Sequence, residues 1–119
     1  MKKFLAIYIG TMEAFEKAGW NRLDEKKRKE LEQSGMQGWM QWASVNAAAI
    51  VDQGNPLGKT KRASKKGIED IKNSMTGYTI VEAESHAAAA RLFENHPHFT
   101  IFPGDSVEIM ECLPLPVMG

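Results

Sequence analysis

The chain has 119 residues, of which 43% are hydrophobic and 25% charged, and its 15 basic and 15 acidic side chains cancel. This composition is typical of one globular domain, which we place at residues 1–119. Zero net charge argues against a dedicated nucleic-acid binder, and no apolar stretch approaches the roughly 20 residues that span a membrane. The one cysteine, Cys112, cannot form an internal disulfide, so we expect a cytoplasmic protein.

The first predicted element is a strand at residues 4–9, a run of strand-forming side chains that ends at Gly10. A short helix is expected around residues 12–17. A long helix should then begin near Asp24 or Asn21, because either side chain can cap a helix N-terminus.

Apolar residues repeat at helical spacing from Met36 to Ile50, so this helix is predicted to continue until the stop signal that begins at Gly54. Gly35 and Gly38 each weaken a helix by about 1 kcal/mol relative to alanine. We therefore expect a kink or break at these two glycines.

The second half of the chain is predicted to begin with a hairpin of two short strands and to end with a strand, a helix and another strand. These elements are placed at residues 59–64, 68–72, 77–83, 86–95 and 107–113. Ser85 should cap the helix and Pro97 should stop it. Cys112 would then be a buried, inert thiol in the last strand.

This order of elements is β-α-β-β-α-β, which predicts an α+β domain of the ferredoxin-like type. The hairpin within residues 57–72 would extend or replace the second strand. Two right-handed crossovers place both helices on one face of the sheet and leave the other face uncovered.

The first strand is nevertheless apolar on both faces, with Phe4, Ala6 and Tyr8 on one side and Leu5 and Ile7 on the other. An uncovered apolar face of several hundred Å2 exceeds what monomers usually expose. We therefore expect a homodimer that packs sheet against sheet.

Two histidines are the candidates for acid–base chemistry. His96 and His98 titrate near neutral pH and suit proton transfer, but two histidines without a third ligand do not make a metal site. The simpler alternative is that His96 ends a helix, where the helix dipole favours a positive charge.

Four aromatic side chains could line a ligand pocket: Tyr8, Trp39, Trp42 and Tyr78. Packing in the core is the more common use of aromatic residues at this spacing.

Two other patterns have simpler interpretations. The segment from Gly54 to Thr60 imitates a phosphate-binding loop, but three residues separate its glycines where the motif needs four. The basic residues between Lys59 and Lys66 could contact phosphate, yet lysines also protect an edge strand from aggregation. We expect a turn and a protected edge, and no nucleic-acid partner.

Two segments of the chain resemble the YCII-related family. One is Trp39-Met40-x-Trp42 followed by Asp52-x-Gly54-Asn55-Pro56-Leu57-Gly58. The other runs from Gly77-Tyr78 to the Ser85-capped, alanine-rich helix and His96-Pro97. Together they place the resemblance over residues 4–113.

This resemblance implies a ferredoxin-like fold that forms a dimeric α/β barrel, a superfamily that includes cofactor-independent lyases and isomerases acting on small, often aromatic compounds. Many YCII-related proteins carry an Asp-Gly-Pro-Phe motif before the third strand, and this chain has none there; Asp70 is similar only in kind.

Two functions therefore stay open. One is a lyase- or isomerase-like enzyme with His96 or His98 as general acid or base. The other is a non-catalytic dimeric module that binds a small ligand or a partner. Neither needs a cofactor or a metal.

Overall fold

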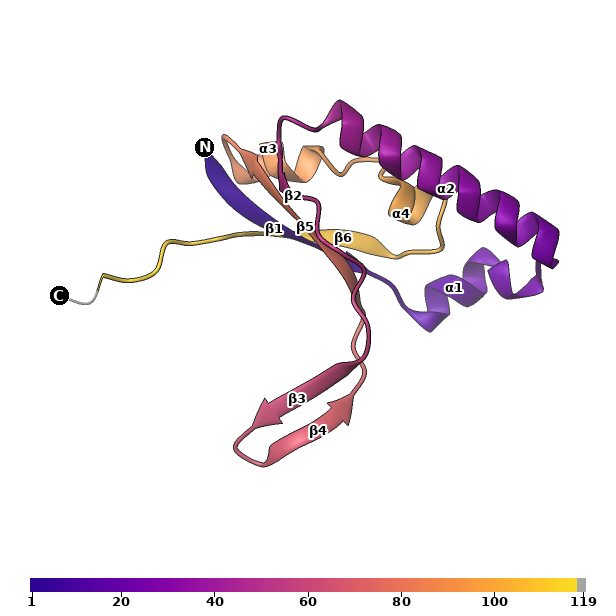
Figure 1. Ribbon diagram of the computed structural model, residues 1–119, viewed down its shortest axis with the longest axis horizontal. Helices are drawn as coiled ribbons and strands as arrows, with labels where there is room; N and C mark the ends of the chain where they lie inside the picture. The colour runs from indigo at the N-terminus through magenta and orange to yellow at the C-terminus, as the bar shows by residue number, and fades with distance from the viewer. Residues whose placement is uncertain (118–119) are drawn as a thin grey trace.

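The structure, a computed structural model, describes residues 1–117. These residues form six strands and four α-helices, joined by loops (Figure 1). In chain order they are β1 (Lys2–Ile9), α1 (Met12–Ala18), the 3-10 turn η1 (Trp20–Arg22), α2 (Glu25–Val45), β2 (Ile50–Asp52), β3 (Thr60–Ser64), β4 (Gly67–Ile71), β5 (Met75–Ala83), α3 (His86–Arg91), α4 (Pro97–Thr100) and β6 (Ser106–Glu111).

The main sheet has the strand order β2-β5-β1-β6, and every neighbouring pair is antiparallel. This is the strand order of the ferredoxin-like plan, so the predicted α+β class and its order of elements are confirmed. Helices α2, α3 and α4 lie on one side of this sheet (Figure 1).

The core lies between the sheet and these helices. Alternate residues of a strand point to opposite faces, and the buried set follows that period of two. Phe4, Ala6 and Tyr8 of β1 lie beside Thr79 and Val81 of β5, and each is at most 3% exposed. Trp39, Trp42, Ala89 and Phe93 pack against them from the helical side.

The opposite face of the sheet is apolar, and no helix of the described chain covers it (Figure 1). Leu5 pairs with Ile80 on one side and with Met110 on the other, and Ile7 pairs with Tyr78. Most of these side chains are partly exposed to water, and Met110 is 43% exposed. The prediction of an uncovered apolar face is confirmed, and we call this surface the open face.

Helix α2 runs without a break through both glycines and is straight in Figure 1, contrary to the kink or break expected from sequence. A Cβ atom on Gly35 would lie 2.5 Å from the ring of Phe102, and one on Gly38 would crowd Ile101 and Pro97. Glycine is therefore used here for close packing, and the contacts it permits offset its poor helix propensity.

The second strand lies earlier than predicted. Helix α2 ends at Val45, and the residues from Ile50 to Asp52 form β2 instead of a last helical turn. The predicted hairpin exists as β3 and β4, but it forms a separate two-stranded sheet. It extends the loop between β2 and β5 and does not replace the second strand.

The segment between β5 and β6 also differs from the prediction. Helix α3 ends at Arg91, and Pro97 starts the short helix α4. Proline suits the first position of a helix because its missing N–H has no partner to lose there. The last strand ends at Glu111, which leaves Cys112 exposed and not buried as expected.

Helix caps follow the sequence closely. The side chains of Thr11, Asp24 and Ser85 accept hydrogen bonds from the backbone N–H groups three residues on. No helix within residues 1–117 has the length and apolar character needed to cross a membrane.

Candidate functional site

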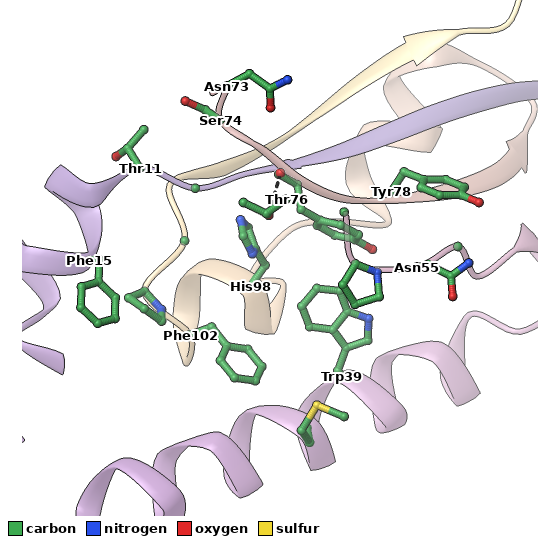
Figure 2. A pocket seen from close by; sticks show the side chains of 18 of the residues that line it. Thr11, Phe15, Trp39, Asn55, Asn73, Ser74, Thr76, Tyr78, His98 and Phe102 are labelled. Atoms are coloured by element: carbon green, nitrogen blue, oxygen red, sulfur yellow. Dashed lines mark hydrogen bonds between the residues drawn. The ribbon is translucent and has the colours of Figure 1, made fainter. Parts of the chain in front are cut away.

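A cavity of about 820 Å3 opens beyond the end of β1, between the sheet and α2 (Figure 2). Its walls come from segments far apart in the chain: the start of α1, the middle of α2, the loops on either side of β3 and β4, and the loop after α4. The lining residues are Tyr8, Gly10, Thr11, Met12, Phe15, Met36, Trp39, Met40, Gln53, Gly54, Asn55, Pro56, Lys72, Asn73, Ser74, Thr76, Gly77, Tyr78, His98, Phe102, Pro103 and Gly104.

One side of this cavity is apolar and aromatic. Trp39 of α2, Phe15 of α1 and Phe102 after α4 are separated from the polar side chains of Asn73 and Ser74, with His98 between the two groups in the view of Figure 2. An apolar wall with a few polar groups is the usual make-up of a small-molecule site. A flat ring compound would suit such a wall, because rings stack on one another edge to face or offset.

His98 is an ionisable side chain that the fold holds in one orientation at this cavity. It is 7% exposed, and its Nε2 lies 2.7 Å from the carbonyl oxygen of Ile9. A carbonyl can only accept, so Nε2 carries the proton and the neutral ring keeps Nδ1 as an acceptor. Gly104 packs against the ring, where a Cβ atom would collide with it.

Burial lowers the pKa of His98, while the hydrogen bond to the Ile9 carbonyl and the charge of Asp105 act in the opposite direction. A lowered pKa keeps the imidazole neutral at pH 7. A neutral imidazole with a fixed tautomer can take a proton from a bound molecule at Nδ1.

Asp105 also ties the start of β6 to the start of α1. Its carboxylate accepts from the backbone N–H of Thr11 at 2.7 Å and from the hydroxyl of Thr11 at 3.0 Å. The backbone N–H of Asp105 in turn donates to the carbonyl of Ile9, the same oxygen that holds His98.

His96 does not reach the cavity. It is 0% exposed, and the rings of Tyr8, Trp39 and Trp42 surround it with centroids 4.5–5.2 Å away. Its Nδ1 accepts from the backbone N–H of His98 at 3.0 Å, which makes it the N-cap of α4. Its Nε2 has no hydrogen-bond partner among the described residues.

Burial first, and the neighbouring His98 second, lower the pKa of His96 to about 3. His96 is therefore a neutral core residue at physiological pH. The expectation that a helix C-terminus favours its positive charge is wrong, because the residue starts a helix and lies among apolar rings.

Tyr8 lines the cavity but cannot give a proton to a ligand readily. The hydroxyl of Thr79 donates to the carbonyl of Gln53 at 3.0 Å, so Tyr8 must donate its own proton to Thr79, at 2.7 Å. Burial is the main cause that raises the pKa of Tyr8 to about 12. Tyr8 thus acts as a fixed part of the cavity wall.

The other predicted pocket aromatics separate into three places. Trp39 faces the cavity. Trp42 lies in the core, where its indole N–H donates to the carbonyl of Leu92 at 2.7 Å. Tyr78 lines the edge of the cavity beside Gly54, and its ring is directed away from Trp39 in Figure 2.

The polar rim of the cavity was not found from sequence. It consists of Asn55, Lys72, Asn73, Ser74 and Thr76, which flank β3 and β4. The available signal was weak: most of these are short polar residues in loops, and such residues are equally common in loops without a function.

Within residues 1–117, no three His, Cys, Asp or Glu side chains come close enough together to hold a metal ion. The cavity lining itself contains no carboxylate; its charged or ionisable side chains are those of Lys72, His98 and the two tyrosines.

Comparison with known proteins gives a likeness of fold. No family model and no curated protein matches the chain. Among solved structures, it is similar to 5-chloro-2-hydroxyhydroquinone dehydrochlorinase from Burkholderia phenoliruptrix AC1100, in complex with 2,5-dihydroxybenzoquinone. The identity is 16% and the TM-score 0.53, over 91% of this chain and 90% of the other.

Proposed function

We propose that this protein binds a small aromatic or cyclic compound in the cavity and transfers a proton to or from it through His98, as a lyase or isomerase would. The observation that carries the proposal is His98 itself: an imidazole held in one tautomer by the Ile9 carbonyl, beside an aromatic wall. A base fixed in this way removes a proton without first having to be oriented.

The structural neighbour supports the same direction. It is a dehydrochlorinase of 5-chloro-2-hydroxyhydroquinone, and 2,5-dihydroxybenzoquinone is bound to it. At 16% identity this likeness carries the fold only. The reaction class proposed for this chain therefore depends on the cavity and on His98.

The natural test is turnover of a panel of hydroxylated and halogenated aromatic compounds by the wild type and by His98→Gln. His86→Gln is a matched control, because the Nε2 of His86 also lies 2.7 Å from a carbonyl, that of Ile109, but outside the cavity. We expect His98→Gln to lower the rate about 100-fold or more, within the range of general acid–base catalysis, and His86→Gln to leave it unchanged. Equal rates for all three proteins would refute the role of His98.

A specific observation supports the second candidate, a non-catalytic ligand-binding module. Enzymes that transfer protons commonly pair two ionisable groups, and no carboxylate lines this cavity beside His98. Calorimetry would detect binding of the same compounds. Binding without turnover by the wild type would favour this candidate.

We also propose that the protein is a YCII-related member of the dimeric α/β-barrel superfamily and works as a homodimer. The open face supports a second copy, since Leu5, Ile7, Ile80 and Met110 form a continuous apolar surface across three strands. Covering such a surface contributes about 25 cal/mol per Å2 before the cost of association. Sedimentation equilibrium at micromolar concentration tests this, and a monomer would contradict it.

A further inference from the structure

The hairpin of β3 and β4 stands apart from the rest of the molecule. It forms its own two-stranded sheet, and every residue from Lys61 to Asp70 is exposed. Figure 1 shows it projecting from the end of the main sheet, on the side opposite α2, α3 and α4. Isolated two-stranded hairpins are only marginally stable in water, so an arm of this kind gains stability from a surface that it can contact.

Charge divides the chain between this arm and the body. Residues 59–72 carry six basic and two acidic side chains, a net charge of +4. Because the whole chain is neutral, the remaining residues carry −4. These opposite net charges favour contact between the arm of one copy and the body of another.

The arm neutralises part of its own charge and leaves the tip free. Lys61 pairs with Asp70 at 2.7 Å and Arg62 with Glu69 at 2.9 Å, both across the hairpin. Lys65 and Lys66, at the turn, take part in no ion pair within the described residues. The positive charges of Lys65 and Lys66 at the tip are thus available for ion pairs with a partner.

The position of the arm identifies the partner. It projects on the side of the open face, so a second copy seated on that face lies beside it. The open face also carries an acidic side chain near its apolar centre, because Glu108 lies opposite Ile7 by register. Glu82 lies on the same face, but Lys3 is opposite it and offsets its charge. Apolar contact and charge therefore both favour another copy of this chain.

Both stems of the arm belong to the cavity. Gln53 to Pro56 lead into it and Lys72 to Ser74 lead out, and all of these residues line the cavity wall. Next to these stems, the N–H of Leu57 donates to the carbonyl of Thr76, in β5, at 2.9 Å. Whatever holds the arm in place also holds this wall.

We propose that the β3–β4 arm clasps the second copy of a homodimer, with its lysine tip against acidic groups of the partner's body, and that this contact positions the polar wall of the cavity. The inference rests on the homodimer proposed above. It adds a role for the basic segment, which is then neither a nucleic-acid site nor merely a protected edge.

The test compares Lys65→Glu/Lys66→Glu with Lys26→Glu/Lys27→Glu, two variants that change the net charge equally. Lys26 and Lys27 lie at the start of α2, and neither takes part in an ion pair among the described residues. Sedimentation equilibrium at low salt should show the dimer dissociation constant rising about tenfold in the arm variant, with little change in the control. High salt should remove most of the difference.

Amide hydrogen exchange of residues 72–74 supplies a second readout, and we expect it to be faster in the arm variant than in the control. Equal dissociation constants for the two variants would overturn the proposed role of the arm, but not the proposed homodimer. A wild-type monomer would overturn both proposals. The arm would instead be a nucleic-acid site if two results came together: a dimer dissociation constant that does not change in the arm variant, and salt-sensitive binding of RNA or DNA that is lost in that variant.

Discussion

Acid should destabilise this protein through His96. The pKa of its imidazole is about 3 in the folded chain, against 6.5 for an unperturbed histidine. Below pH 6.5 the imidazole of His96 is therefore protonated in the unfolded state but stays neutral in the folded state. The free energy of unfolding consequently falls as the pH drops. The loss ends only near the folded pKa.

The magnitude follows from the separation of the two pKa values. Each pH unit between them costs about 1.4 kcal/mol for one group, so lowering the pH from about 7 to 5 should remove about 2 kcal/mol. The lowered pKa of His98 acts in the same direction. A loss of this size is a large fraction of the stability of an ordinary domain.

Urea unfolding followed by tryptophan fluorescence at a fixed protein concentration, at several pH values from 7 to 5, measures this loss. The comparison is with His96→Asn, because asparagine can still cap α4 but does not titrate. The variant should be less stable at pH 7, since it loses the packing of a buried ring, yet its stability should depend less on pH. Parallel pH dependences for the two proteins would refute the assignment of His96 as a buried neutral base.

Two further substitutions probe the cavity. Gly104→Ala places a methyl group against the ring of His98; we expect a loss of roughly 1–3 kcal/mol by urea unfolding, the usual cost of overpacking, and weaker ligand binding by calorimetry. Tyr8→Phe removes the hydrogen bond donated to Thr79 inside the core, and should cost about 1 kcal/mol in the same unfolding assay. The pH dependence of turnover, which we assign to His98, should not change in this variant.

Gly58→Ala is the control for Gly104→Ala, since an added Cβ there meets no atom within 4 Å. Equal stability losses for these two alanines would show that the packing against His98 has no special role. For Tyr8→Phe, stability equal to that of the wild type would show that the hydroxyl contributes nothing net to the core.

Local chemistry determined the elements that the sequence predicted well. The strand at residues 4–9, the caps at Asp24 and Ser85, and the hairpin around Lys65 each depend on side chains and backbone preferences within a few residues. Such preferences are contained in the chain itself, and two apolar faces on one strand were enough to predict the open face of the sheet.

Tertiary contacts decided the rest. From sequence, Gly35 is predicted to weaken the helix. In the structure Phe102, 67 positions later, packs against this glycine, and the helix continues. His96 and His98 look equivalent in sequence, yet a proline between them starts a helix that turns one ring into the core and the other into the cavity. A cavity lined from Tyr8 to Gly104 exists only when these segments meet, because contacts between distant residues leave no local pattern.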